Sequence, residues 1–427
     1  MSEKNRNYDL IIVGGGAAGL AAAVAFGRRM GGNARAAVIE KEEKPGRKLL
    51  ATGNGRCNLT NINMSEDFYN ENARAFVRNI LQRTTPERLI KSFEQLGLIC
   101  RTDDAGRVYP YANQASAVLD ILMMWIEKTG VEVICGEKVG SIVSAQGYTV
   151  TTAEKIYHTK KLILASGGAV QKALGSDGSS YEFAKMLGLK CESVFPSLAP
   201  VIVTDKSLNI VKGVRAQAAV TACCGEKTLV SERGELQFNE KNISGICVFQ
   251  LSRFVNEHFA DKEKYKGIYI SADLAPDITE NKLFSILDNK RRDLPDTKAD
   301  DVFVGIINKK LGLYLCKRSG VVCSGRTVGE LTDKELKSLA DITKNCSFTP
   351  LKMSEYGSAQ VTAGGISVDE IDRNMRVKKY DGLYAVGEAL DVDGMCGGYN
   401  LHFAFASGIA AGTAAAKRGG IKNDKNK

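Results

Sequence analysis

The sequence predicts an α/β fold, in which strands buried in a sheet alternate with helices that pack on it. Three apolar runs favour this class. Leu10 to Val13 precedes a glycine-rich turn and an alanine-rich stretch, Ala36 to Ile39 follows that stretch, and Leu383 to Val386 stands before a second glycine-rich turn and small-residue stretch. Continuous apolar runs of this length are typical of strands buried on both faces, whose parallel neighbours are joined by helices.

Length and composition limit the possible classes of protein. The chain has 427 residues, of which 44% are hydrophobic and 25% charged, as expected for a soluble protein of two or three domains. The formal charge of +9 is spread along the chain, and no basic run is interleaved with aromatic residues. Leu10 to Phe26 imitates a membrane span, but four glycines interrupt it, and it is shorter than the roughly 20 apolar residues that a bilayer requires. We expect a cytoplasmic protein that acts on a small molecule, with no nucleic-acid or membrane partner; the sequence leaves the oligomeric state open.

The first turn has the spacing of a dinucleotide fingerprint. Gly14-x-Gly16-x-x-Gly19 follows the strand and opens the helix. The first glycine permits the tight turn, the second lets backbone approach a pyrophosphate, and the third lets helix and strand touch. Glu40 ends the second strand, 21 residues after Gly19, where a carboxylate can accept both ribose hydroxyls and disfavours a 2′-phosphate. FAD or NAD is therefore expected rather than NADP; the alternative is an ordinary βαβ unit with a chance acid.

The C-terminal strand and helix favour FAD over NAD. The strand ends in Gly387-Glu388, a glycine-rich turn spans residues 394 to 398, and a small-residue helix is expected from about Asn400 to Ala416. This pattern is similar to the C-terminal motif of FAD enzymes, in which the acid binds the ribityl chain and the helix N-terminus stabilises the reduced flavin. A third element, Lys161 to Gly188, contains Ala165 to Gly168 at a strand end, as where a chain passes under the cofactor. The alternative for the C-terminal motif is one more strand and helix of the sheet.

Longer motifs resemble one family. "GRKLLATGNGRCNLTN", "GRVYPYANQASAV", "PSLAPV", "VTAGGI" and "GLYAVGEALDVDGMCGGYN" together resemble the BaiN/YhiN-like flavoproteins, also called NAD(P)/FAD-dependent oxidoreductases or the aminoacetone oxidase family. The resemblance covers about Asp9 to Ala416. It implies a Rossmann-like FAD-binding domain built from both ends of the chain, with an inserted β-rich, barrel-like subdomain and a small helical subdomain. The expected boundaries are 1–194 and 347–427 for the FAD domain, 195–273 for the β-rich part and 274–346 for the helical part.

The loop Gly46 to Asn61 is expected to run along the cofactor. Arg47 and Lys48 can offset pyrophosphate charge, Gly53 and Gly55 let backbone amides approach, and Arg56 to Asn58 would meet the flavin ring. All predicted FAD contacts are Gly14, Gly16, Ala17, Ala18, Gly19, Glu40, Lys41, Arg47, Lys48, Leu49, Thr52, Gly53, Asn54, Gly55, Arg56, Cys57, Asn58, Val139, Ala165, Gly167, Gly387, Glu388, Asp391, Gly397, Gly398, Asn400 and Leu401.

The candidate catalytic residues are His402, Tyr399 and Arg56, with Arg107 or Tyr109 across the pocket. His402 can titrate near neutral pH as a general acid or base, or it can only hydrogen-bond a flavin carbonyl. Tyr399 can equally be a packing or cofactor contact.

The cysteines do not suggest redox or metal chemistry. Their number, eleven, is odd, and no CxxC pair occurs, so no metal site is expected. Cys57 has no partner at disulfide-reductase spacing, which argues against a dithiol mechanism with Cys396 and favours a structural thiol.

These residues favour an FAD-dependent oxidoreductase. The first interpretation is an NAD(P)H-linked reductase of an activated C=C bond in a small hydrophobic or carboxylated substrate; the family resemblance suggests a bile-acid-like 3-oxo enone. No second GxGxxG motif offers a separate nicotinamide site, so NAD(P)H would dock transiently. The alternatives are an amine or aminoketone oxidase that uses oxygen and a flavin-binding or RNA-associated protein without turnover.

Overall fold

A computed structural model describes residues 5–417 and divides the chain into two compact units. The first unit combines the residues up to Val194 with those from Val361 onward, and the second is Phe195–Gln360. Each unit has its own hydrophobic core. The expected α/β domain built from both ends of the chain, with a β-rich and helical insertion, is confirmed.

A seven-stranded sheet forms the centre of the first unit. Its order is β6-β2-β1-β9-β8-β7, with β18 also paired to β9. The strands are β1 (Asn5–Val13), β2 (Ala36–Ile39), β6 (Glu132–Ile134), β7 (Val139–Ala145), β8 (Gly147–Thr152), β9 (Ile156–Leu164) and β18 (Leu383–Ala385). Strands β6, β2, β1, β9 and β18 run parallel, whereas β7 and β8 continue antiparallel from β9. The predicted strands β1, β2 and β18 are thus buried, and their carboxyl ends lie along one edge of the sheet.

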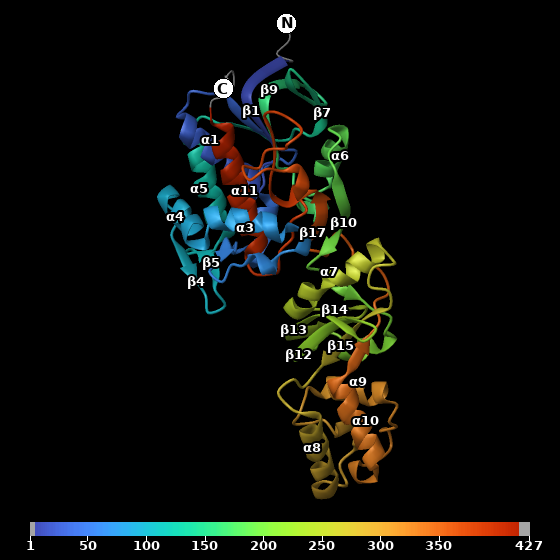
Figure 1. Cartoon of the computed structure of the whole chain (residues 1–427). Helices are drawn as coiled ribbons and strands as arrows, with labels where there is room; N and C mark the ends of the chain where they lie inside the picture. The colour runs from blue at the N-terminus through green and yellow to red at the C-terminus, as the bar shows by residue number, and fades with distance from the viewer. Residues whose placement is uncertain (1–4, 418–427) are drawn as a thin grey trace, which may run out of the picture. The chain divides into compact units, whose positions relative to one another are not determined.

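Three long helices lie side by side in the first unit: α1 (Ala17–Met30), α5 (Ala115–Lys128) and α11 (Tyr399–Ala415) (Figure 1). Helices α1 and α11 come from opposite ends of the chain and touch through small residues. A Cβ atom at Gly408 would lie 2.2 Å from the Ala18 carbonyl oxygen, and one at Gly412 would lie 2.2 Å from that of Ala22. The small-residue composition of both helices therefore permits their close packing.

Shorter elements complete the first unit. The helices are α2 (Arg47–Ala51), α3 (Arg74–Arg83), α4 (Pro86–Leu96) and α6 (Ser179–Met186). A three-stranded sheet is formed by β3 (Thr60–Asn61), β5 (Arg107–Pro110) and β4 (Cys100–Thr102), and a ladder by β10 (Cys191–Ser197) and β17 (Val361–Ile366).

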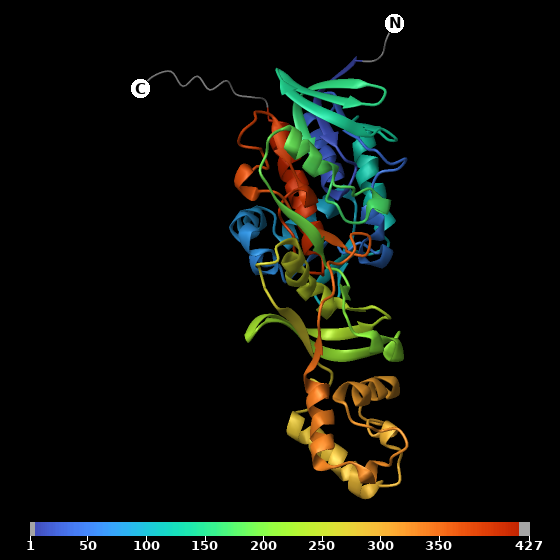
Figure 2. The same ribbon diagram turned by 90° about the vertical axis from the view of Figure 1, so that its right-hand side faces the viewer.

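The second unit contains a curved antiparallel sheet of order β11-β14-β13-β12-β15-β16 (Figure 2). Its strands are β11 (Val201–Ile202), β12 (Arg215–Cys224), β13 (Lys227–Phe238), β14 (Asn242–Ser244), β15 (Ile268–Asp273) and β16 (Cys346–Phe348). A bridge between Val203 and Pro350 joins the chain just beyond the two edge strands, which gives the expected barrel-like character. The helices are α7 (Ile246–Ala260), α8 (Glu280–Asp293), α9 (Lys309–Ser319) and α10 (Asp333–Lys344).

The insertion ends later than expected. Residues 347–360 were assigned to the FAD domain, but Ile270 pairs with Phe348 in the inserted sheet, and the first unit resumes at Val361. The β-rich and helical parts also share a single core, in which Phe238 of β13 lies against Tyr314 of α9 with ring centroids 6.1 Å apart. The insertion is therefore one unit, because neither part separately encloses the apolar residues between them.

Candidate functional site

The fingerprint glycines have two distinct roles. Gly14 has a φ of +107°, and a Cβ atom there would lie 2.4 Å from the Ala165 carbonyl oxygen; one at Gly19 would lie 2.0 Å from that of Gly14. Gly16 is the N-cap of α1, and a Cβ atom added there would have no neighbouring atom within 4 Å. Packing therefore requires glycine at positions 14 and 19, whereas Gly16 leaves space that a ligand can enter.

The amino end of α1 suits an anion. The first intrahelical hydrogen bond runs from Leu20 N–H to the Gly16 carbonyl, at 2.9 Å, so the N–H groups of Ala17, Ala18 and Gly19 lie beyond the helical ladder. No acidic side chain occupies this first turn. Unpaired N–H groups and the positive end of the helix dipole together favour a phosphate group.

Glu40 lies beside this turn, at the carboxyl end of β2. Its buried carboxylate accepts hydrogen bonds from the N–H groups of Gly15, at 2.6 Å, and Glu42, at 2.9 Å. A small cavity of about 30 Å³ adjoins it and is also lined by Gly14, Lys41 and Val139. Each carboxylate oxygen can accept a further hydrogen bond, so this placement fits recognition of a ribose.

The side chain of Lys41, a predicted FAD contact, is held in an ion pair. Its ammonium group lies 2.6 Å from the Asp177 carboxylate. Burial alone would raise the pKa of Asp177, but hydrogen bonds from Lys41 and Ser179 outweigh it and lower the pKa to about 2. Lys41 and Asp177 therefore form a permanent ion pair that ties β2 to the chain before α6.

In the loop Gly46 to Asn61, the opening loop, the cations Arg47 and Lys48 are also paired. Arg47 forms an ion pair with Glu42, and the Lys48 ammonium lies 2.7 and 2.9 Å from the two carboxylate oxygens of Glu388. Each of these cations is thus balanced by a carboxylate in this structure, and their expected contact with the pyrophosphate stays a prediction. Lys48 instead joins the opening loop to the C-terminal motif.

The rest of the opening loop divides into core and exposed backbone. The side chains of Leu49 and Cys57 are buried in the core, and Thr52 donates to the Leu49 carbonyl at 2.6 Å. Burial raises the pKa of Cys57 to about 12, so this residue is a neutral thiol. The short turn Thr52–Gly55 follows, with left-handed backbone at Gly53, Asn54 and Gly55, and it leads to Arg56 and Asn58. Leu49 and Cys57, two of the predicted FAD contacts, therefore offer a ligand almost no accessible surface in this structure.

Glu388 is the meeting point of three distant segments. Besides Lys48, its carboxylate accepts from the Thr362 N–H at 2.9 Å. A Cβ atom at Gly168 would lie 2.6 Å from the same carboxylate oxygen, and one at Gly387 would lie 2.8 Å from the Ala18 Cβ. The C-terminal motif therefore contacts the first turn of α1, as a shared cofactor site requires. Gly167, with a φ of +75°, is at the same strand end as Gly168 and Ala165.

Other predicted contacts support the loop before α11. Asn70 donates to the buried Asp391 carboxylate at 3.1 Å, and the Asn400 amide makes two 2.8 Å hydrogen bonds that close the backbone of Gly394. Leu401 packs against the first core. For Asp391, Asn400 and Leu401, these contacts favour a structural role over the predicted cofactor contact.

His402 does not have the environment of a general acid or base. It is fully buried, with Nδ1 2.8 Å from the Thr60 hydroxyl and Nε2 2.9 Å from the Thr84 carbonyl oxygen. A carbonyl can only accept, so Nε2 carries the proton and Nδ1 accepts from Thr60. Burial lowers the pKa of His402 from 6.5 to about 4. The predicted catalytic role is corrected: neutral His402 ties α11 to β3 and to the chain before α4.

Tyr399 remains a candidate proton donor. Tyr399 is the first residue of α11, and its ring packs against Phe68 with the centroids 5.0 Å apart. Burial raises the pKa of its phenol. Within residues 5–417 the phenol has no hydrogen-bond partner. The group is thus protonated at neutral pH and able to donate.

Arg56 and Tyr109 form a neighbouring pair. The Arg56 guanidinium lies over the Tyr109 ring, 4.8 Å from its centroid, and its Nε donates to the Gly53 carbonyl at 3.0 Å. Strand β3 joins this pair to the loop before α11, because Asn61 pairs with Arg107 of β5 and donates to the Gly397 carbonyl at 3.1 Å. A Cβ atom at Gly398 would lie 2.5 Å from the Thr60 carbonyl. Opening loop, β5 and α11 therefore meet at one place.

Thr362 and Asp177 were not identified from the sequence as site residues. Thr362 lies inside the "VTAGGI" motif, which could have indicated it, whereas the pairing of Asp177 with Lys41 depends on tertiary structure. Within residues 5–417, no group of three or more His, Cys, Asp or Glu residues could hold a metal ion, and no helix is long and apolar enough to cross a membrane.

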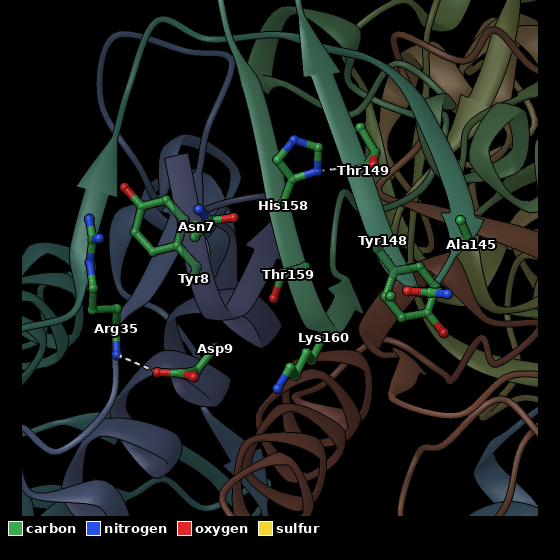
Figure 3. Close-up of a pocket in the computed structure, with 12 residues that line it drawn as sticks. Asn7, Tyr8, Asp9, Arg35, Ala145, Tyr148, Thr149, His158, Thr159 and Lys160 are labelled. Carbon is green, nitrogen blue, oxygen red and sulfur yellow. Dashed lines mark hydrogen bonds between the residues drawn. The ribbon is translucent and has the colours of Figure 1, made fainter. Parts of the chain in front are cut away.

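A larger cavity lies elsewhere on the same sheet. About 500 Å³ in volume, it is lined at the amino end of β1 by Asn7 and at the neighbouring strands by His158 and Thr149, in one cross-strand row (Figure 3). Gly14 and Gly16 follow the opposite end of β1. This cavity is therefore separate from the candidate cofactor site.

Comparisons with known proteins identify the family of the chain. The HI0933-like protein Rossmann domain family matches residues 8–414. A 3-dehydro-bile acid delta(4,6)-reductase of Clostridium scindens is 34% identical over 95% of this chain and 98% of its own. A ribosomal RNA dihydrouridine synthase of Haemophilus influenzae is 27% identical over 96% of this chain and 98% of its own.

Among solved structures, a quinol-fumarate reductase with menaquinol molecules covers 100% of this chain and 73% of its own, with a TM-score of 0.50 and 16% identity, which shows a shared fold. The family match spans nearly all of the described residues and includes both halves of the dinucleotide site. The chain therefore belongs to the HI0933-like Rossmann-domain family and is a flavin-dependent oxidoreductase.

Proposed function

We propose that this protein is a cytoplasmic, NAD(P)H-linked reductase of a carbon–carbon double bond conjugated to a carbonyl group, in a small hydrophobic or carboxylated molecule. The observation that carries the proposal is the protonated phenol of Tyr399, which has no hydrogen-bond partner among residues 5–417. It lies at the amino end of α11, beside the segment that joins Arg56 to the C-terminal motif. The relative from Clostridium scindens, named as a delta(4,6)-reductase, supports the reaction class.

The described residues fit FAD. The open space at Gly16 and the free N–H groups of α1 suit its pyrophosphate, and the Glu40 carboxylate suits a ribose. Gly387, which lies against Ala18 in the first turn of α1, and Glu388 would hold the ribityl side of the molecule. When bound, FAD supplies the hydride transfer that no amino-acid side chain can perform.

Reduction of a conjugated double bond also needs a proton and a partner for the carbonyl oxygen. Tyr399 can give a proton to the carbon that does not receive the hydride, since its raised pKa keeps the phenol protonated. Arg56 can bind the carbonyl oxygen, because only its Nε hydrogen bonds within residues 5–417, which leaves the terminal guanidinium nitrogens available.

The test is a two-stage anaerobic reaction followed by flavin absorbance. NADH or NADPH should bleach the flavin, and a 3-oxo-4,6-diene steroid carboxylate should restore its colour. Tyr399→Phe should leave the first stage unchanged and slow the second by about 100-fold, the lower range for loss of a general acid. Tyr111→Phe, at a 70% exposed phenol, is the matched control and should behave as wild type.

Two results would contradict the proposal. An equal rate of reoxidation in Tyr399→Phe would remove the residue from the proton-transfer step. Bleaching by a small amine but by neither nicotinamide nucleotide, with peroxide formed in air, would instead identify an oxidase.

A second candidate substrate is uracil in ribosomal RNA. Relatives from Haemophilus influenzae and Escherichia coli, 27% and 28% identical, are named ribosomal RNA dihydrouridine synthases, and they align over 96% and 94% of this chain. The C5–C6 bond of uracil is also conjugated to a carbonyl, so the same site chemistry would serve both substrates. Reoxidation of the reduced protein by a ribosomal RNA fragment, with dihydrouridine in the product, and not by the steroid, would favour RNA over a small molecule.

A further inference from the structure

A third cavity, of a size suited to a small molecule, lies between helices α1, α4, α5 and α11. Its volume is about 360 Å³, within the range of small-molecule sites, and all four helices contribute to its lining. The walls are largely apolar, with Val24, Phe93, Leu122 and Ile409 among the lining residues. An occupant must therefore present a largely apolar body.

One part of the lining is cationic. Arg28 and Arg29 stand in the last turn of α1, both exposed, and neither forms an ion pair with any residue from 5 to 417. No acidic side chain lines the cavity. The helix dipole accounts for a preference for cations at this end, but it does not neutralise two guanidinium groups. The charge on this side remains available to an anion.

We propose that this cavity binds an amphipathic carboxylate, such as a medium-chain fatty acid, with its hydrocarbon body between the four helices and its head group at Arg28 and Arg29. The site is distinct from the cofactor edge, the edge of the sheet at the carboxyl ends of the parallel strands where the candidate cofactor site lies. Arg29 follows Gly19 by ten residues on the same helix, which places them about 15 Å apart along the helix axis.

The protein contains one tryptophan, and it contacts the lining of this cavity. The Arg28 guanidinium lies 4.8 Å from the Trp125 ring centroid, and the Trp125 Nε1–H donates to the carbonyl of Leu96, another lining residue, at 2.9 Å. A carboxylate that draws Arg28 away from the ring would change the tryptophan emission. Trp125 fluorescence therefore reports on the Arg28 side of this cavity.

The experiment is a titration of the flavin-loaded protein with decanoate, followed by Trp125 fluorescence below the micelle concentration. We expect a saturable change, an affinity about fourfold higher than for nonanoate, as the burial of one methylene predicts, and weaker binding of decanol and decylamine. Arg29→Gln should weaken decanoate binding by about two- to fivefold, as for a partly exposed ion pair. Arg101→Gln, another exposed arginine, should not change it.

Ala25→Phe is the blocking variant, because Ala25 lines the cavity and a benzyl group would occupy it. It should abolish the fluorescence change while flavin content and turnover stay at the wild-type level. If this variant fails to retain flavin, Arg29→Glu serves instead and should weaken decanoate binding more than Arg29→Gln does.

Three results would overturn the proposal: no change in Trp125 emission with decanoate, equal binding of decylamine and decanoate, or unchanged decanoate binding in a folded Ala25→Phe variant. Competition between decanoate and the reducible substrate, with binding retained in Ala25→Phe, would place the carboxylate in the catalytic site. The three overturning results are read from decanoate and decylamine binding alone and do not depend on the proposed reductase reaction.

Discussion

Replacing His402 with glutamine should remove a pH-dependent part of the protein's stability and leave catalysis largely intact. The glutamine amide can donate to the Thr84 carbonyl and accept from the Thr60 hydroxyl, as the neutral imidazole does. The difference is that glutamine does not titrate. At pH 7.5 we therefore expect free energies of unfolding within about 1 kcal/mol of each other.

The magnitude follows from the shift in the His402 pKa. Burial lowers it from an ordinary 6.5 to about 4, so the unfolded chain binds a proton at a pH where the folded chain does not. The stability due to the neutral ring is complete above pH 6.5 and is lost as the pH falls from 6.5 toward 4. Relative to the glutamine variant, wild type should lose about 2 kcal/mol by pH 5 and about 3 kcal/mol by pH 4.

The assay is urea unfolding of both proteins at a series of pH values from 7.5 to 4, with flavin content and kcat measured in parallel. Subtracting the two curves removes the titration of all groups that both proteins share. His402→Ala is the contrasting variant: it leaves the Thr84 and Thr60 groups unpaired and opens a cavity, and should cost about 2–4 kcal/mol at pH 7.5.

A difference curve that stays flat between pH 6.5 and 4 would refute the assigned pKa. If His402→Gln loses one limb of the kcat–pH profile and its free energy of unfolding equals that of wild type at every pH, His402 acts as a catalytic acid or base.

Three further predictions concern the cofactor edge. Gly19→Ala should destabilise the fold by about 1–3 kcal/mol, the cost of overpacking, whereas Gly16→Ala should fold normally but retain less FAD after gel filtration; equal behaviour of the two variants would contradict their separate roles. Glu40→Ala should weaken FAD retention, and an unchanged flavin content per chain would exclude ribose binding by this carboxylate. Cys57 should resist a thiol reagent at pH 8 because its pKa is raised to about 12, as mass spectrometry of the native protein can check.

The local parts of the site could be predicted from the sequence. The dinucleotide fingerprint consists of β1, the glycine turn, α1 and Glu40, all within 40 residues. Their spacing in the sequence follows from the local backbone geometry of a strand, turn and helix. The C-terminal helix was expected from about residue 400 to 416 and extends over Tyr399–Ala415.

The partners of charged side chains could not be predicted in the same way. Lys48 and Glu388 are 340 positions apart, and no sequence pattern shows that they neutralise each other. His402 resembles a titratable site residue in sequence, and only its burial and its contacts with Thr60 and Thr84 show otherwise. The end of the insertion was misplaced for a related reason: strand β16 is only three residues long, and its pairing with β15 has no local signal.

The contact between α1 and α11 has a consequence for synthesis of the protein. Helix α1 is translated long before α11, so the face that Ala18 and Ala22 present to Gly408 and Gly412 stays uncovered until α11 has been made. The second unit is continuous in sequence and precedes β17, β18 and α11, so it can assemble while the first unit still lacks them. Completion of the first unit must therefore wait for the last tenth of the chain, and a nascent or truncated protein would carry its cofactor helix without the partner that orders it.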